Sequence, residues 1–211
     1  MKKILVVILA LSFLAVPAMN AQSRQLKKQL KKEYKLKIKK YSKEDWEVFG
    51  TSRTLEVALL MHYDKLNDGE KREIVVHTTS TNKNIGKEKL LANACSQYAQ
   101  SMGSNVKRRI VSDMGSKISP EELAEFEAFY SAYENNVAAE IKGELYNTFC
   151  LYRDVKLNGT AAFEFEGYFI VDIDAATQAR IRAFENAARE SAAAQKYAEQ
   201  VSEFIKEGMV E

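Results

Sequence analysis

The sequence predicts an α+β domain with an antiparallel or mixed sheet, helices mainly on one face of that sheet, and a long C-terminal helix. Three observations lead to this prediction. Alternating apolar and polar residues on both sides of Asn158-Gly159 are typical of a β-hairpin. Several longer segments carry apolar residues at helical spacing. Nine glycines and two prolines in 211 residues are too few for an all-β sandwich or propeller, which turns about every ten residues.

The composition indicates a chain that folds in water. Hydrophobic residues make up 46% of it and charged residues 28%, which excludes both a disordered chain and one with many membrane spans. The length beyond the N-terminal segments suits one domain, and we predict a single α+β domain over residues 46–211.

Residues 1–21 have the pattern of a secretory signal peptide. Lys2 and Lys3 precede an apolar stretch from Ile4 to Val16, and small residues follow it, ending at Ala21. Thirteen residues are too few to span a bilayer, which takes about 20, so we expect no integral membrane span after processing. The predicted location is periplasmic or secreted, including a position peripheral to the outer membrane.

Residues 22–45 form a basic arm. Residues 24–43 contain ten Lys or Arg residues and one acidic residue, Glu33, so their net charge is +9. Residues 44–211 have a net charge of −9. Apolar residues recur at steps of three or four, which predicts an amphipathic helix. These residues are Leu26, Leu30, Tyr34, Ile38 and Tyr41.

The lysines of the arm are the candidate residues for binding an anionic surface. They are Lys27, Lys28, Lys31, Lys32, Lys35 and Lys39. Candidate partners are anionic lipid, lipopolysaccharide or an acidic envelope protein. We do not expect nucleic acid as a partner, because an exported protein rarely meets it and the arm lacks an Arg-rich or aromatic-stacking pattern. An arm that folds back on the acidic body is the alternative.

The first half of the domain alternates strands and helices. We expect a short strand at Trp46–Phe49, a helix capped by Thr51 and Ser52, a buried strand at Glu73–Thr79 and a helix over residues 87–102. Residues 105–116 fit neither the helical nor the strand pattern well, and we predict a short strand and a loop there.

Ser119, Pro120 and Glu122 form the clearest helix start in the chain, with a hydroxyl at the N-cap, proline at the first position and glutamate three residues after the cap. The helix should run to about Ile141. Four aromatic residues at helical spacing should pack inward: Phe126, Phe129, Tyr130 and Tyr133.

The hairpin allows two registers. A two-residue loop places Phe163 and Phe165 on the face of Cys150 and Tyr152, whereas a bulged turn with Gly159 in the left-handed conformation places them with Leu151 and Phe149. The bulged turn separates apolar from polar side chains better, so it is our prediction. After the hairpin, Asp174 should cap one long helix that reaches Glu207.

Cys95 and Cys150 are the two cysteines. In an oxidising compartment they could form a disulfide, but two buried thiols are the favoured interpretation.

Catalytic signatures are missing from the sequence. His62 and His77 lack partners at metal-ligand spacing, and no phosphate-binding glycine loop or serine elbow occurs. We therefore expect no catalytic residue, cofactor or metal. The best enzymatic alternative places Glu164 and Glu166 roughly 7 Å apart on one strand face as the acid and base of a glycan hydrolase.

The same strand face is also a candidate recognition surface. With the bulged register its polar and aromatic residues are Tyr146, Tyr152, Tyr168, Glu164 and Glu166.

The order of elements resembles that of the small surface-lipoprotein family, which includes flagellum-associated envelope lipoproteins, and it is similar to uncharacterised exported proteins of Bacteroidetes. The resemblance rests on Trp46 and Gly50 ahead of a helix, on Leu91-Ala92-Asn93-Ala94, and on Gly167-Tyr168-Phe169-Ile170-Val171. It implies a compact α+β fold and a non-catalytic envelope role. This chain departs from the family in that it has no anchoring cysteine and adds the basic arm and a long final helix. We expect an exported, non-enzymatic envelope binding or assembly protein, and a hydrolase without a recognisable motif is the alternative.

Overall fold

The computed structural model describes residues 28–29 and 31–207 of the chain. The predicted signal peptide, residues 1–21, lies outside the described residues, as do Leu26, Lys27 and Leu30. The chain divides into two compact units, one ending at Trp46 and the other beginning at Glu47. No helix among the described residues is both long enough and apolar enough to cross a bilayer.

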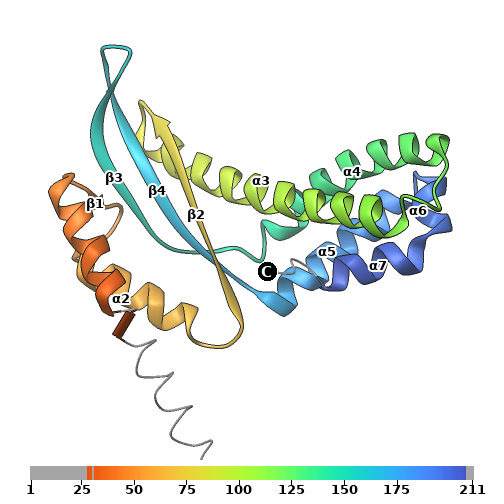
Figure 1. Ribbon diagram of the computed structural model, residues 1–211. Coiled ribbons are helices and arrows are strands. Elements are labelled where there is room, and N and C mark those ends of the chain that lie inside the picture. The colour runs from red at the N-terminus through yellow and green to blue at the C-terminus, as the bar shows by residue number, and fades with distance from the viewer. Residues whose placement is uncertain (1–27, 30, 208–211) are drawn as a thin grey trace, which may run out of the picture. The chain divides into compact units, whose positions relative to one another are not determined.

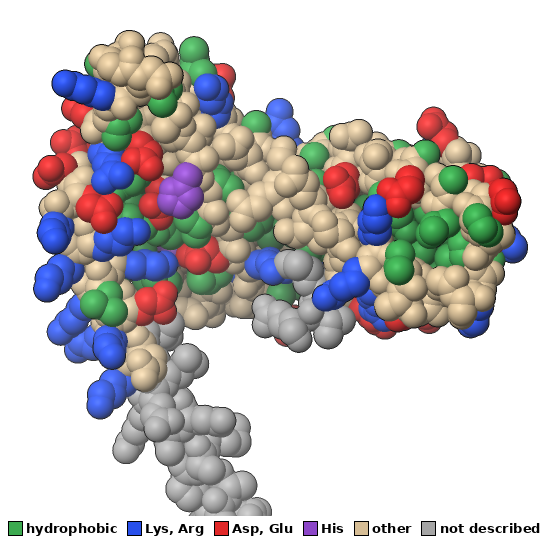
Figure 2. Space-filling model, turned by 45° about the horizontal axis from the view of Figure 1, so that its top comes forward, with side chains coloured by type: hydrophobic (Ala, Val, Ile, Leu, Met, Phe, Trp, Pro, Cys, Tyr) green, Lys and Arg blue, Asp and Glu red, His purple; other side chains and the backbone are tan. Residues whose placement is uncertain are grey.

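The described part of the arm, residues 28–29 and 31–43, is helical. Tyr34 and Ile38 are partly covered and Tyr41 is buried, and the ring of Tyr41 packs edge-on against Trp46 with centroids 6.0 Å apart. Basic side chains crowd this segment at the lower left of Figure 2. Within the described residues the helix is therefore amphipathic, as the spacing predicts.

The second unit is built around a four-stranded antiparallel sheet in the order β1-β3-β4-β2 (Figure 1). The strands are β1 Glu47–Val48, β2 Lys71–Ser80, β3 Tyr146–Leu157 and β4 Thr160–Asp172. Because β4 pairs with both β2 and β3, the hairpin and the earlier strand form one sheet. The fold is α+β, which confirms the predicted class.

Helices cover both faces of the sheet, and most of them lie on one side (Figure 1). Helix α2, Leu55–Leu66, covers one face, where the ring of His62 contacts Tyr168 at a centroid distance of 5.2 Å. Helix α3, Lys83–Arg109, covers the other face. It approaches β4 closely, because a Cβ atom on Gly167 would lie only 3.0 Å from Cδ1 of Leu90.

The predicted strand and loop at residues 105–116 are wrong. Helix α3 continues to Arg109 and passes directly into a π-helical segment, η1 Ile110–Met114. Val106, Ile110 and Met114 are all at most 2% exposed, and they follow one another at steps of four residues. This helical spacing outweighs the three consecutive basic residues between Val106 and Ile110, which reach solvent from the other side of the helix.

Helix α4, Pro120–Ile141, confirms the predicted start and end. The Ser119 hydroxyl accepts a bond from the Glu122 backbone N–H, and the Glu122 carboxylate accepts one from the Ser119 backbone N–H. The four aromatic residues predicted to pack inward are all buried. They pack in the helical core with α3 and with α5, Ile173–Ala188.

The predicted bulged turn in the hairpin is wrong. Leu157 pairs with Thr160 across a two-residue loop, and both Asn158 (φ 50°) and Gly159 (φ 82°) adopt left-handed conformations. The register shift lies at the other end of the hairpin, between Asn147 and Phe149. Separation of apolar from polar side chains predicts the register only if one face of the hairpin is solvated, whereas α2 covers the second face and accommodates apolar side chains there as well.

The predicted long final helix is also wrong, and three helices replace it: α5, α6 Ala192–Lys196 and α7 Ala198–Glu207. The chain leaves the first helix after Ala188, and the Ser191 hydroxyl caps the next by accepting from the backbone N–H of Ala194. The Gln195 side chain donates to the carbonyls of Ala188 and Arg189, so part of the exposed end of α5 is satisfied. The first helix is capped by Asp172, two residues before the predicted Asp174.

Helix α7 is tied to α5 by the buried Arg180. Its Nε donates to the carbonyl of Ile205, and its Nη atoms donate to the hydroxyls of Tyr98 and Thr177, at 2.7 to 3.1 Å. The carbonyl lies near the C-terminus of α7, where the helix dipole favours a cation.

Candidate functional site

The arm lysines predicted to bind an anionic surface lie on an exposed helical surface wherever the structure describes them. Lys27 lies outside the described residues. The exposed ones are Lys28, Lys31, Lys32, Lys35 and Lys39.

The five residues predicted to form a recognition face do not share one exposed surface. Tyr168 and Glu166 are buried at 1% and 5% exposure; Tyr168 packs against His62 of α2, and its hydroxyl donates to Glu166. Tyr152 lies on the α3 side, with its ring tilted toward Phe165. Tyr146 and Glu164 remain on the α2 side.

The two carboxylates of the hydrolase alternative are both engaged. Arg153 contacts Oε2 of Glu164 at 2.7 Å. Glu166 accepts from Tyr168 at 2.9 Å and lies 3.7 Å from Nδ1 of the exposed His77. These contacts favour a structural role for both carboxylates.

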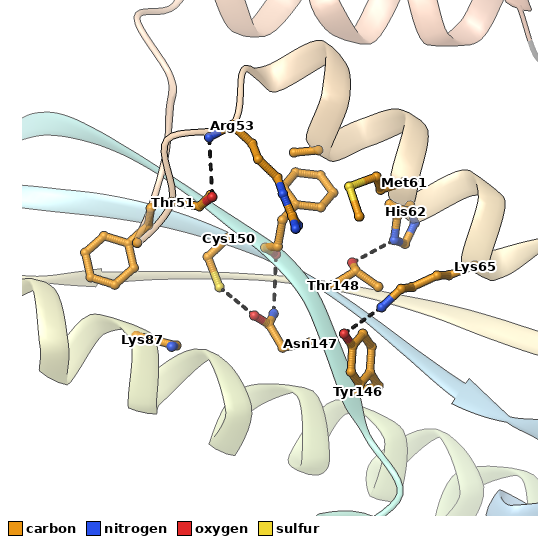
Figure 3. A pocket seen from close by; sticks show the side chains of 14 residues that line it. Thr51, Arg53, Met61, His62, Lys65, Lys87, Tyr146, Asn147, Thr148 and Cys150 are labelled. Atoms are coloured by element: carbon orange, nitrogen blue, oxygen red, sulfur yellow. Dashed lines mark hydrogen bonds between the residues drawn. The ribbon is translucent and has the colours of Figure 1, made fainter.

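A pocket of about 190 Å³ opens beside the edge of β3 (Figure 3). The short β1 pairs only with Leu151 and Tyr152, and Phe49 donates from its backbone to the carbonyl of Cys150. Beyond that point, residues 146–149 have no strand beside them on this side among the described residues. The bulge of β3 falls in this uncovered stretch. Bulges are frequent beside functional sites because they redirect side chains.

The side chain of Asn147 fixes the bulge. Its Nδ2 donates to the carbonyls of Phe149 and Tyr168 at 3.3 and 3.1 Å, and its Oδ1 accepts from Sγ of Cys150 at 3.3 Å. The Asn147 side chain, which lines the pocket, is therefore held in place by hydrogen bonds to both its nitrogen and its oxygen.

Three cationic side chains line the pocket: Arg53, Lys65 and Lys87. Figure 3 shows Arg53 and Lys65 on the α2 side of β3 and Lys87 on the α3 side. Among the described residues, no carboxylate lines the pocket and none forms an ion pair with any of the three cations. Lys65 instead donates to the Tyr146 hydroxyl at 2.6 Å. The pocket therefore concentrates uncompensated positive charge.

His62 lies at the inner wall of the pocket and is completely buried. Its Nε2 lies 2.7 Å from Oε1 of Glu73, and its Nδ1 lies 2.8 Å from Oγ1 of Thr148. The Thr148 hydroxyl donates to the carbonyl of Tyr168 at 3.0 Å, so it accepts from Nδ1 of His62.

The chain from Glu73 through His62 to Thr148 has the residue types of a nucleophile and its base. However, the hydroxyl proton of Thr148 is committed to a backbone carbonyl, and the imidazole has no exposed surface. The three residues therefore form a structural hydrogen-bond network that joins α2 to β2 and β3. Within the described residues, no three His, Cys, Asp or Glu side chains gather to hold a metal ion.

Both cysteines are free and buried. Burial raises the pKa of the Cys150 thiol, and the hydrogen bond to Asn147 and the charge of Lys87 only partly oppose this. Burial likewise raises the pKa of Cys95. The thiol at the pocket therefore stays protonated and is a poor nucleophile.

Sequence reasoning missed Arg53, Lys65 and Lys87 as a group. They come from the loop before α2, from α2 and from α3, so no local pattern joins them. A signal existed only for His62, because it follows Ala58 and Leu59 at helical spacing and so lies on the buried face of α2. A buried imidazole requires polar partners, but the sequence does not identify them.

Comparison of the chain with family models, with curated proteins and with solved structures yields no match.

Proposed function

We propose that this chain is an exported, non-enzymatic binding protein of the cell envelope that captures an anionic group in the pocket beside β3. The observation that carries the proposal is the charge of the pocket, whose wall, among the described residues, has three cations and no carboxylate. Like charges that line one site repel one another, and an anion bound among them relieves that repulsion. Arg and Lys also form the stronger, charge-assisted hydrogen bonds with carboxylate or phosphate oxygens.

The basic arm has a separate role in this proposal, which is to hold the protein at an anionic surface. Anionic lipid, lipopolysaccharide and an acidic envelope protein all suit its exposed lysines. Each lysine near an anionic headgroup layer contributes about 1 kcal/mol, so five or six of them suffice for reversible attachment. An envelope role also agrees with the resemblance to surface lipoproteins, which remains a prediction.

We place binding ahead of glycan hydrolysis because of the two carboxylates on β4. Arg153 forms an ion pair with Glu164 and Tyr168 donates to Glu166, and these contacts support a structural role for both carboxylates. Turnover of a glycan that is lost in Glu164→Gln and Glu166→Gln variants would reverse this order.

Calorimetric titration with inorganic phosphate tests the pocket. We expect saturable binding, with at least a tenfold loss of affinity in the double variant Arg53→Gln/Lys65→Gln, because two charge-assisted contacts disappear. The matched control is Lys89→Gln/Arg189→Gln, which removes the same charge from exposed positions outside the pocket. Equal losses in both double variants would show that phosphate responds only to net charge, and the pocket proposal would fail.

Sedimentation with anionic vesicles tests the arm. The mature chain should sediment with vesicles at low salt and be released at high salt, because salt screens the attraction. A chain that lacks residues 22–43 should remain in the supernatant under both conditions. If the truncated chain sediments as well as the full one, the arm is not the anchor.

A further inference from the structure

We propose that the ligand of the pocket is an anionic amphiphile, with a phosphate or carboxylate head and a single alkyl chain. This inference rests on the proposed function, because it assigns the head to the cationic pocket. It adds a place for the alkyl chain of the ligand, which is a second cavity on the α3 side of β3.

The second cavity has a volume of about 520 Å³ and lies between α3 and β3. Its walls include the apolar side chains of Leu91, Leu145 and Phe169. Leu91 and Leu145 are only partly buried, so they present apolar surface to a ligand. We call this cavity the apolar groove. Burial of alkyl carbon against such surface is the main source of affinity for a lipid-like ligand.

The pocket and the apolar groove adjoin each other. Lys87, Asn147 and Cys150 line both of them. Asn147 is fixed by its hydrogen bonds to Phe149, Tyr168 and Cys150, so the junction has a defined shape. One ligand can therefore pass from the cationic site over the open edge of β3 into the groove.

The charges of the two cavities determine the direction in which the ligand lies. Among the described residues that line either cavity, the one carboxylate is the exposed Glu88, and it belongs to the groove. It repels an anionic head from the groove, whereas Arg53 and Lys65 attract the head at the opposite end. Lys87 lies at the junction, where its ammonium group can meet the head while its alkyl stem lies along the chain.

A series of alkyl phosphates provides the test. The titrants are inorganic phosphate and butyl, hexyl, octyl and decyl phosphate, each below its micelle-forming concentration. Burial of each methylene should lower Kd about three- to fourfold, or about tenfold for every two carbons, until the chain fills the groove. Alkanoates should show the same dependence, since their head is also anionic. Decanol, which lacks the charged head, should bind at least tenfold more weakly than decyl phosphate.

Two variants locate the alkyl chain. Leu145→Gln makes the groove polar, and Asn84→Trp obstructs it from an exposed position of α3. Each should weaken decyl phosphate about tenfold and leave the affinity for inorganic phosphate unchanged. Leu123→Gln, which changes an exposed leucine of α4 outside both cavities, is the control. Two groove variants are used so that a folding defect in one does not decide the result.

Several outcomes would overturn the inference. A Kd that does not change with chain length, while inorganic phosphate still binds and still depends on Arg53 and Lys65, would refute the amphiphile and leave the proposed function standing. If inorganic phosphate does not bind to the wild-type chain at all, both the amphiphile and the proposed function are refuted. Equal displacement of decyl phosphate by a hexaglutamate peptide would indicate a peptide strand at the open edge of β3, and would also contradict the amphiphile.

Discussion

Tyr133 and Tyr98 are buried tyrosines whose hydroxyl groups have opposite surroundings. The Tyr133 hydroxyl has no hydrogen-bond partner among the described residues, whereas the Tyr98 hydroxyl accepts from the buried Arg180 at 2.7 Å. A buried polar group without a partner lowers stability, so its removal should do no harm.

We therefore predict that Tyr133→Phe leaves the free energy of unfolding unchanged or raises it. Tyr98→Phe should lower it by about 1 to 3 kcal/mol, because Arg180 loses an acceptor in the interior. Urea denaturation of both variants measures the difference. A loss in Tyr133→Phe as large as that in Tyr98→Phe would contradict this account of the core.

Tyr130 should make the protein sensitive to alkali. Burial, with a smaller effect from Glu127, raises the pKa of Tyr130 to about 12, whereas the unfolded chain ionises at the ordinary value of about 10. Because of the raised pKa, Tyr130 loses its hydroxyl proton in the unfolded state at a lower pH than in the folded state. The contribution of Tyr130 to the free energy of unfolding is thus complete below pH 10 and is lost as the pH rises toward 12.

Between these two values the free energy of unfolding should fall by about 1.4 kcal/mol per pH unit on account of this residue. The Tyr130→Phe variant should lack that part of the slope. Urea titrations of both proteins from pH 9 to 12 provide the measurement, and parallel slopes would contradict the prediction.

At the scale of single residues, the sequence predicted contacts that are local in the chain. The bonds between Ser119 and Glu122 span three positions, and helical spacing alone directed the aromatic residues of α4 inward. The partners of His62 lie 11 and 86 positions away. Such pairs depend on how α2 meets the sheet, which no local pattern contains.

At the scale of elements, the hairpin turn offers a clean test of backbone conformation. Gly159 has φ 82°, and a Cβ atom there would meet nothing within 4 Å. Gly159→Ala should therefore lower the free energy of unfolding by about 1 to 2 kcal/mol through backbone strain alone.

Gly143 is the control, because it is also uncrowded but lies outside the left-handed region. Gly143→Ala should be neutral or stabilise by up to about 1 kcal/mol. Equal effects of the two changes, measured by urea denaturation, would contradict the two-residue turn.

Elements were predicted well where one periodicity dominates and poorly where two elements compete. The hairpin strands and α4 were found because their patterns are unmixed. The register was wrong because α2 covers the face that the pattern alone assigned to solvent. The alanine-rich sequence predicts one continuous last helix because alanine favours helix throughout, whereas the Ser191 cap starts a new helix.

At the scale of the whole molecule, the fold class followed from the sequence and the candidate site did not. Element order and glycine content are global properties, and they were sufficient for an α+β assignment. The pocket arises from a missing strand partner, because β1 is only two residues long and leaves part of β3 uncovered. Cations from three separate segments then face the same space. That convergence is a property of the assembled sheet and its helices.

Among the described residues, we propose two groups of cations that bind anions, those of the arm and those of the pocket, and one measurement separates them. Inorganic phosphate is titrated into the isotopically labelled mature chain, and the backbone amide resonances are followed by NMR. We predict saturable shifts centred on residues 146–150 and on Arg53 and Lys65, with little change in residues 28–43. Shifts confined to the arm, or no saturable shift along the edge of β3, would contradict the claim that the pocket binds an anion.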